Sequence, residues 1–173
     1  MNTPDADTRR IGRRLGLLAT LAFLALGWVS FDGALERRED PNRNLVVAPG
    51  ASELVLQRNR AGHYLLPGEI NGHPVRLLLD TGATQVSVPA RLAAELGLQA
   101  GAPASVLTAN GAVTVRQTRI PRLAFGPFEF RDVAGHLNPG MQGDEVLLGM
   151  SALRHLEFTQ RGGTLTLRAP GSG

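Results

Sequence analysis

The chain has 173 residues, of which 43% are hydrophobic, so its length allows one domain of ordinary size with a packed core. The chain contains no cysteine, which excludes disulfides, zinc–thiolate sites and cysteine nucleophiles. The formal net charge is +3, but Arg and acidic residues nearly balance from residue 52 onward, and no basic stripe interleaved with aromatic residues supports nucleic-acid binding. The four histidines, at 63, 73, 136 and 155, lack the paired spacing of a metal site, so we expect no metal and no cofactor.

An uncharged stretch of 17 residues, "LGLLATLAFLALGWVSF" at 15–31, follows a basic tail at 1–14. As a helix it would span about 25 Å, which is short but within the range for a bilayer. Trp28 lies near one end, where an indole suits the interface. Because arginines are denser on the amino-terminal side, we expect a single transmembrane helix with a cytoplasmic amino terminus. The rest of the chain would lie outside the cytoplasm, in the periplasm if the cell is Gram-negative.

Two other interpretations of residues 15–31 stay open. The triplet "ALG" at 25–27 fits the small-residue cleavage site of a signal peptide, although the bulky Trp28 follows at once. The segment is also long enough for a buried helix of a soluble domain, which the flanking arginines disfavour. Residues 32–51, "DGALERREDPNRNLVVAPGA", mix charge with Pro and Gly and predict a tether. As a flexible coil, this tether would reach about 25 Å.

Residues 54–79 predict β-strands. The segments "HYLLPGEI" and "VRLLL" flank "NGHP", and Asn71-Gly72 is a strong hairpin signal because both residues tolerate positive φ. The second arm of this hairpin runs directly into Asp80. After it, "QVSVP" alternates with the period of a strand, and "PARLAAELG" at 89–97 changes to helical spacing with a glycine at its end.

The second half of the chain also predicts short strands and tight turns. "SVLTANGAVTV" at 105–115 is a hairpin pattern with Asn-Gly at its tip, as in many ordinary meander turns. Two further strands flank Gly126-Pro127, and a last hairpin surrounds Gly162-Gly163. Between them, "EVLLGMSALRHLEF" at 145–158 predicts an apolar strand, a glycine and one or two helical turns. The segment 52–170 is therefore expected to be an all-β domain with one or two short helices.

The apolar strand that ends in Asp80 raises a question of chemistry. A charged, unpaired carboxylate costs several kcal/mol to desolvate, so Asp80 is either a turn residue at the surface or an acid retained for its chemistry. Asp-Thr-Gly alone is weak support for the second interpretation, because turns are rich in all three residues. The neighbouring sequence is more specific: a strand and a short helix follow the Asp-Thr-Gly, and "VLLG" later repeats an apolar run that ends in glycine.

Together, three motifs resemble a retropepsin-like aspartic protease of the membrane-anchored, single-domain bacterial branch, over about residues 54–168. "LLLDTGAT" at 77–84 is similar to the active-site loop, "TANG" at 108–111 to the tip of the flap, and "VLLGMSAL" at 146–153 to the element beneath that loop. The resemblance implies Asp80 as the catalytic acid; Thr81, Gly82, Ala83 and Thr84 as its supporting loop; Thr108, Ala109, Asn110 and Gly111 as the substrate-binding flap; and Leu147, Leu148 and Gly149 as the packing beneath the loop.

The resemblance also implies a closed β-barrel and an endopeptidase. Peptide hydrolysis by carboxylates uses two acids that share one proton, because two carboxylates about 3 Å apart cannot both ionise. The domain holds one Asp-Thr-Gly, so the second acid would be Asp80 of another copy in a homodimer. Thr81 would then form a hydrogen bond across the dimer, Gly82 would contact the substrate backbone, and the flap would close over an extended peptide.

Two alternatives to a membrane-tethered homodimeric endopeptidase remain at this point. One is a catalytically silent dimer of the same fold that binds peptides or partner proteins, and the other is an unrelated tethered β-domain with a fortuitous turn at Asp80. Peptide cleavage that depends on Asp80 would distinguish the endopeptidase from both alternatives. Dimerisation without cleavage would favour the silent binder.

Overall fold

The computed structural model describes residues 23–24, 39–48, 50–108 and 111–171. Two compact units are distinguished, Met1–Arg38 and Glu39–Gly173, and the second contains the strands. In order, its elements are β1 (Glu53–Gln57), β2 (Leu65–Ile70), β3 (His73–Leu79), β4 (Val86–Pro89), the 3-10 helix η1 (Ala90–Leu92), β5 (Pro103–Thr108), β6 (Gly111–Phe125), β7 (Phe128–Asn138), β8 (Glu145–Leu148), α2 (Met150–Leu153), β9 (Glu157–Arg161) and β10 (Thr164–Arg168).

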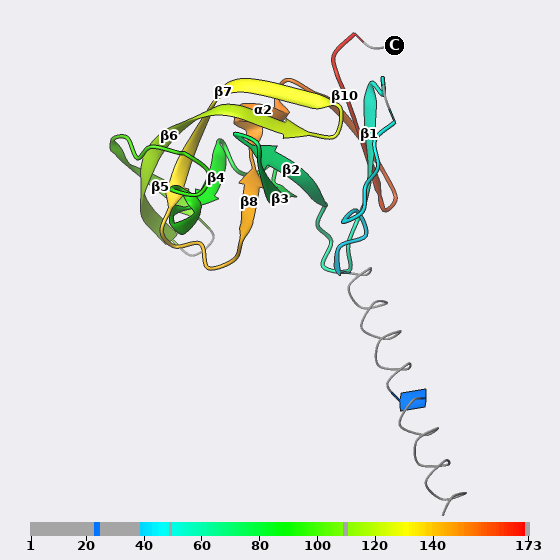
Figure 1. Cartoon of the computed structure of the whole chain (residues 1–173), viewed down its shortest axis with the longest axis horizontal. Coiled ribbons are helices and arrows are strands. Elements are labelled where there is room, and N and C mark those ends of the chain that lie inside the picture. Colours follow the sequence, from blue (N-terminus) through cyan, green and yellow to red (C-terminus); the bar gives the residue numbers. More distant parts are fainter. Residues whose placement is uncertain (1–22, 25–38, 49, 109–110, 172–173) are drawn as a thin grey trace, which may run out of the picture. The chain divides into compact units, whose positions relative to one another are not determined.

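Six of these strands close into a barrel, in the order β2-β3-β8-β4-β7-β6 (Figure 1). The ring closes where β2 also pairs with β6, through Glu69 opposite Ala124 and Ile70 opposite Leu123. β5 pairs with β6 alone and extends the sheet beyond the ring. The expected closed, all-β domain with few helices is therefore confirmed.

The first hairpin forms where the sequence predicted it. Asn71 and Gly72 have φ angles of 52° and 84°, which is the backbone of a two-residue hairpin turn that matches strand twist. Ile70 and His73 are paired across the turn, so the register of β2 and β3 is set there. This register brings the end of β3 to Leu79, immediately before Asp80.

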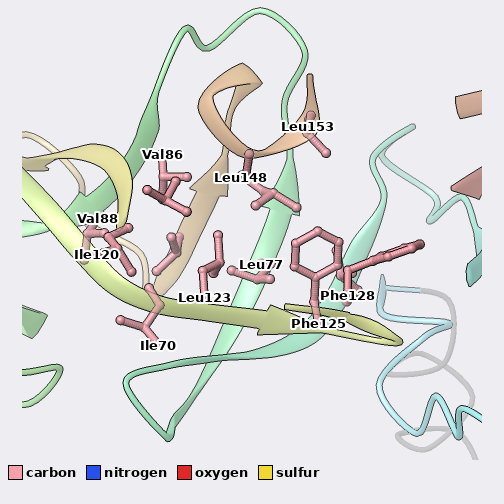
Figure 2. Close-up of a cluster of buried hydrophobic side chains, with 14 of the residues drawn as sticks. Ile70, Leu77, Val86, Val88, Ile120, Leu123, Phe125, Phe128, Leu148 and Leu153 are labelled. Atoms are coloured by element: carbon pink, nitrogen blue, oxygen red, sulfur yellow. The ribbon is translucent and has the colours of Figure 1, made fainter. Parts of the chain in front are cut away.

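The core fills the barrel with side chains from every strand of the ring (Figure 2). Leu77, Val86 and Leu148, from β3, β4 and β8, are fully buried. Burial of each such side chain stabilises the fold by about 1.5–3 kcal/mol. Near the β6–β7 turn, Phe125 and Phe128 meet edge to face with ring centroids 5.7 Å apart. The loop that carries Asp80 is therefore attached to strands that the barrel core stabilises.

A separate sheet of three strands, in the order β1-β10-β9, packs against the same core. In β1 and β10 buried residues alternate with more exposed ones, so that Leu54, Leu56, Leu165 and Leu167 face inward. The predicted hairpin around Gly162-Gly163 joins β9 to β10, and Gly162 has a φ of 57°.

The helix expected over 89–97 is shorter than the spacing predicted. Only Ala90–Leu92 is helical, and turns lead from there to Gly97, which has a φ of 64°. A single bond from the Leu96 N–H to the Leu92 carbonyl keeps the helical spacing of the two leucines. A helix this short gains few backbone bonds for its nucleation, so packing of Leu96 into the core determines the local path.

Part of the expected tether belongs to the compact unit. The Asn42 side chain is buried; its amide donates to the carbonyls of Gln57 (2.9 Å) and Leu65 (2.7 Å), and its oxygen accepts from the Gln57 N–H (2.8 Å). Asp40 forms an ion pair with Arg76 at 3.1 Å. The compact unit thus starts nearer the amino terminus than the boundary expected at residue 52.

The expected membrane span lies almost wholly outside the described residues, since only Phe23 and Leu24 of residues 15–31 are described. Within the described part of the chain, no helix has the length and apolar character needed to cross a bilayer. The transmembrane helix therefore stays a prediction.

Candidate active site

Asp80 is held at the end of β3 by its own backbone and side chain. Its N–H donates to the carbonyl of Leu148 on the neighbouring strand β8, at 3.1 Å. Its carboxylate oxygen Oδ1 accepts the N–H of Gly82 at 2.9 Å, and its carbonyl accepts the N–H of Ala83 at 3.3 Å. This tight turn lifts Asp80 out of the apolar strand and leaves its side chain half-buried, so no full desolvation penalty applies.

The start of α2 lies directly beneath this loop. The N–H of Met150 donates to the carbonyl of Ala83 (2.8 Å), and the N–H of Ser151 donates to the carbonyl of Thr84 (2.9 Å). Gly149 lies so close that an added Cβ would come within 2.7 Å of the Ala83 carbonyl oxygen. Only glycine permits this approach, which explains why a glycine stands at the end of the apolar run.

The hydroxyl of Ser151 connects three elements at the same place. It accepts the N–H of Val86, the first residue of β4, at 3.0 Å and donates to the carbonyl of Ala134 on β7 at 2.7 Å. The Val86 N–H belongs to β4 and the Ala134 carbonyl to β7, and both strands also carry residues of the site. Ser151 therefore fixes the exit of the loop relative to β7.

A cleft of about 850 Å³ opens beside Asp80, between the loop and the hairpin of β5 and β6. Both strands of that hairpin contribute to it, β5 with residues 104–108 and β6 with Val115 and Gln117. The loop contributes Gly82, Ala83 and Thr84, and β8 contributes Leu147. A cleft of this size is within the range of ligand-binding sites.

One part of the cleft lining, called its floor here, consists of the polar residues Ser87, Gln117, His136 and Asn138. Ser87 on β4 pairs with His136 on β7, and His136 pairs with Gln117 on β6, so the three residues form one row across the sheet. All three line the cleft, together with Asn138, two residues further along β7. Burial lowers the pKa of His136 from its ordinary value of 6.5, because the charged imidazolium is poorly solvated there.

The next loop, between β7 and β8, is tied to the site as well. The Arg91 guanidinium donates to the carbonyls of Met141 (3.1 Å) and Gly143 (2.6 Å) and forms an ion pair with Asp144. The Met141 sulfur in turn accepts the hydroxyl of Ser87 at 3.2 Å. Ser87 and Arg91 are thereby joined to the loop between β7 and β8.

The structure places six of the twelve expected site residues in the lining of this one cleft. Asp80, Gly82, Ala83, Thr84, Thr108 and Leu147 line it, whereas Leu148 and Gly149 are buried beneath the loop. Thr81 is exposed and lies outside the lining. At the tip of the β5–β6 hairpin, the Thr108 hydroxyl donates to the Gly111 carbonyl at 2.9 Å. Ala109 and Asn110 lie outside the described residues.

Several residues of the site were missed from the sequence, above all Ser87, His136, Asn138 and Ser151. A signal was available for two of them, because His136 and Asn138 are two positions apart on β7 and so share one face of that strand. Within the described segments, no group of three or more His, Asp or Glu residues is close enough to hold a metal ion.

Comparison with known proteins assigns the family. The model of the gag-polyprotein putative aspartyl protease family matches residues 66–155, more than half of the chain and the whole of the Asp80 loop. The chain belongs to this family. The matched segment runs from β2 to the end of α2, which includes the cleft and the strands of the closed barrel.

A solved structure agrees with this assignment, and two uncharacterized proteins are similar to the chain in sequence. A retropepsin-like aspartic protease from Rickettsia conorii matches with a TM-score of 0.58 and 29% identity, over 68% of this chain and 90% of that one. An uncharacterized protein from the cobV 5′ region of Sinorhizobium sp. is 29% identical over 87% of this chain and 71% of its own length. An uncharacterized protein of Rickettsia prowazekii is 28% identical over 61% of this chain and 46% of its own. The family member described here is thus a retropepsin-like aspartic protease in sequence and fold.

Proposed function

We propose that this retropepsin-like protein is an aspartic endopeptidase that acts as a homodimer, with Asp80 of each copy forming one shared catalytic pair. The observation that carries the proposal is the position of Asp80. Its half-buried carboxylate stands on a braced loop at the edge of a peptide-sized cleft. One such loop is present in each chain, and a carboxylate pair needs two.

The proposed reaction follows from two carboxyl groups that hold one proton. The ionised Asp80 takes a proton from a water molecule, whose oxygen attacks the carbonyl carbon of the scissile peptide bond. The protonated Asp80 of the other copy donates its proton to the carbonyl oxygen, which gives a tetrahedral diol. The Asp80 that took the proton from water then gives it to the amide nitrogen, while the other Asp80 takes a proton from a hydroxyl of the diol, and the carbon–nitrogen bond breaks. Carboxyl and amine products leave, and the pair again shares one proton.

The loop geometry suits this role. The N–H of Gly82 donates to one carboxylate oxygen of Asp80, which restricts the side-chain rotation. The second oxygen is then available for water. Precise placement of this kind contributes to rate because reacting groups are held near their productive geometry. In this proposal Thr81, which is exposed beside Asp80, contacts the second copy.

The proposal includes a membrane anchor at residues 15–31 and an extracytoplasmic domain. Its support is the sequence, namely the uncharged span with arginines crowded on its amino-terminal side. Two chains anchored in one membrane are also confined near each other, which raises the effective concentration for dimerisation.

The test is cleavage by the full chain in detergent micelles. A diverse peptide library is incubated with the protein across pH 4 to 7, and the products are mapped by mass spectrometry. We expect cleavage by the wild-type chain and none by Asp80→Asn, with Asp132→Asn as a matched control, because Asp132 is an exposed carboxylate on β7 paired with Arg119. Dimers that bind peptides without cleaving them would instead identify a silent peptide-binding protein.

A further inference from the structure

The floor of the cleft carries hydrogen-bonding groups that the hydrolysis itself does not use. His136 is the centre of a row with Ser87 on one side and Gln117 on the other, since both neighbours are in register with it. Residues paired in register point to the same face of a sheet, and these three line the cleft that contains Asp80. An apolar peptide side chain would make no hydrogen bond with His136 or Gln117.

The groups on this floor that remain available are mainly donors. The oxygen of the Asn138 carboxamide accepts the N–H of Gly140 at 2.8 Å, which leaves the amide NH2 group for a ligand. The Ser87 hydroxyl is already directed to the sulfur of Met141. A neutral imidazole at His136 offers one N–H donor and one acceptor nitrogen, and the protonated form offers two donors. The Gln117 carboxamide adds two N–H donors and one acceptor oxygen. Carboxyl and carboxamide oxygens are the acceptors that such a set of donors would bind.

The charges around His136 determine which protonation state of His136 favours binding of a substrate carboxylate. The lining side chains from β4, β5, β6 and β8 are uncharged, and Asp80 is the charged group that shares the cleft with His136, among the residues that the structure describes. With His136 neutral, a substrate carboxylate would face the negative charge of the Asp80 pair without a cation. Protonation of His136 would supply that cation.

We propose that Gln117, His136 and Asn138, with Ser87 beside them, form a specificity subsite for a carboxyl or carboxamide side chain of the peptide, selecting the carboxylate once His136 is protonated. This inference rests on the proposed peptidase function and names its substrate class: peptides with Glu, Asp, Gln or Asn at one fixed position near the scissile bond. Burial keeps the pKa of His136 below its ordinary value, so the change in selection falls on the acid side of neutrality.

The test uses the full chain in detergent with a degenerate decapeptide library in which one position at a time is fixed as Glu, Gln, Leu or Arg. Cleavage rates are measured for the wild-type chain. Binding of the same sub-libraries is measured with Asp80→Asn protein, so that the subsite is read without turnover. At one position we expect Gln and Glu to exceed Leu by roughly tenfold, the ratio typical of one or two well-made hydrogen bonds. The ratio of Glu to Gln should rise as the pH falls from 7.5 to 5.

Two variants of His136 separate hydrogen bonding from charge. His136→Leu should lose the preference for Glu and Gln and favour Leu. His136→Gln should keep the preference for Gln but lose the pH dependence of the Glu to Gln ratio. His73→Gln is the matched control, because His73 is exposed at the start of β3 and outside the cleft lining; it should behave as wild type.

The outcomes distinguish this inference from the proposed function. If no peptide is cleaved but Asp80→Asn protein binds Glu and Gln peptides through His136, the peptidase is wrong and the subsite stands. If cleavage occurs with no polar preference at any position, or with a preference unchanged in His136→Leu, the subsite is wrong and the peptidase stands. If the sub-libraries neither bind nor are cleaved, the subsite is overturned as well.

Discussion

Gly149 and Ala83 are in backbone contact, with room for no side chain between them: a Cβ on Gly149 would lie 2.7 Å from the Ala83 carbonyl oxygen. Because that oxygen also accepts the Met150 N–H, the loop of Asp80 cannot move away from an added side chain without losing a hydrogen bond. We expect Gly149→Ala to reduce the free energy of unfolding by about 1–3 kcal/mol, as overpacked cores do, and to abolish cleavage. Chemical denaturation and a peptide assay measure the two effects.

The matched control for this substitution is Gly163→Ala. Gly163 has nothing within 4 Å of an added Cβ, so its replacement tests the same chemical change in open space. The free energy of unfolding should change by no more than about 0.5 kcal/mol. Equal behaviour of the two variants would show that Gly149 does not support the loop.

The second prediction concerns Ser151, which bonds to Val86 and Ala134 at once. Ser151→Ala leaves one N–H and one carbonyl without this partner, which typically costs about 1–3 kcal/mol for each buried group. We expect a lower denaturation midpoint and a lower cleavage rate at a temperature where the variant is still folded. Ser105→Ala, which removes an exposed hydroxyl on β5, is the control for stability and should be neutral. A stable but fully active Ser151→Ala protein would contradict the bracing role.

How far the sequence predicted this structure depends on the range of each interaction. Asn71-Gly72 sets a hairpin through local backbone preference, and the structure has that hairpin with the expected turn. The helix over 89–97 was overestimated, because spacing showed which leucines share a face but not that the turns after Leu92 would replace helical bonds.

The contacts that complete the site are far apart in the sequence. Ser151 reaches Val86 across 65 positions, and β2 meets β6 to close the barrel through Ile70 and Leu123. No local pattern encodes such pairs. The Asp80 loop and Gly149 could be recognised as motifs, whereas His136 became a candidate only when β4 and β6 placed Ser87 and Gln117 beside it.

The third prediction is a pH dependence of stability that arises from His136. Burial lowers the pKa of His136 in the folded state, whereas the unfolded chain has the ordinary value of 6.5. As the pH falls through 6.5, the unfolded chain therefore binds a proton that the folded chain resists, and stability decreases toward acid. His136→Gln should lose less stability than wild type between pH 7.5 and 5 in urea titrations. His73→Gln should keep the wild-type slope; parallel slopes for wild type and His136→Gln would contradict the assignment.

The fourth prediction concerns topology in the membrane. An uncharged span preceded by Arg9, Arg10, Arg13 and Arg14 should leave the carboxyl terminus outside the cytoplasm. Alkaline phosphatase fused to the carboxyl terminus should then be active in bacterial cells, and it should sediment with membranes. Replacing the four arginines with glutamate provides the matched control, which should reduce the active fraction. Activity of a cytoplasmic reporter alone at that end would show the opposite orientation.

The last prediction tests the shared pair. If each active centre takes one Asp80 from each chain, a mixed dimer of wild-type and Asp80→Asn chains holds one carboxylate and one amide and cannot share a proton as the mechanism requires. After co-refolding equal amounts with random pairing, roughly a quarter of the dimers are wild-type homodimers. Activity should therefore fall to about a quarter of that from the same total amount of wild-type protein.

An independent site in each chain would instead leave about half of the activity, because every wild-type chain would keep its own centre. Two different affinity tags, one on each chain, establish that mixed dimers form in the expected proportion. Asp132→Asn is mixed with wild type in parallel and should leave activity unchanged, since this exposed carboxylate pairs with Arg119 away from the cleft lining. A value near half, with mixed dimers recovered on both tags, would rule out a catalytic pair built from two copies of Asp80.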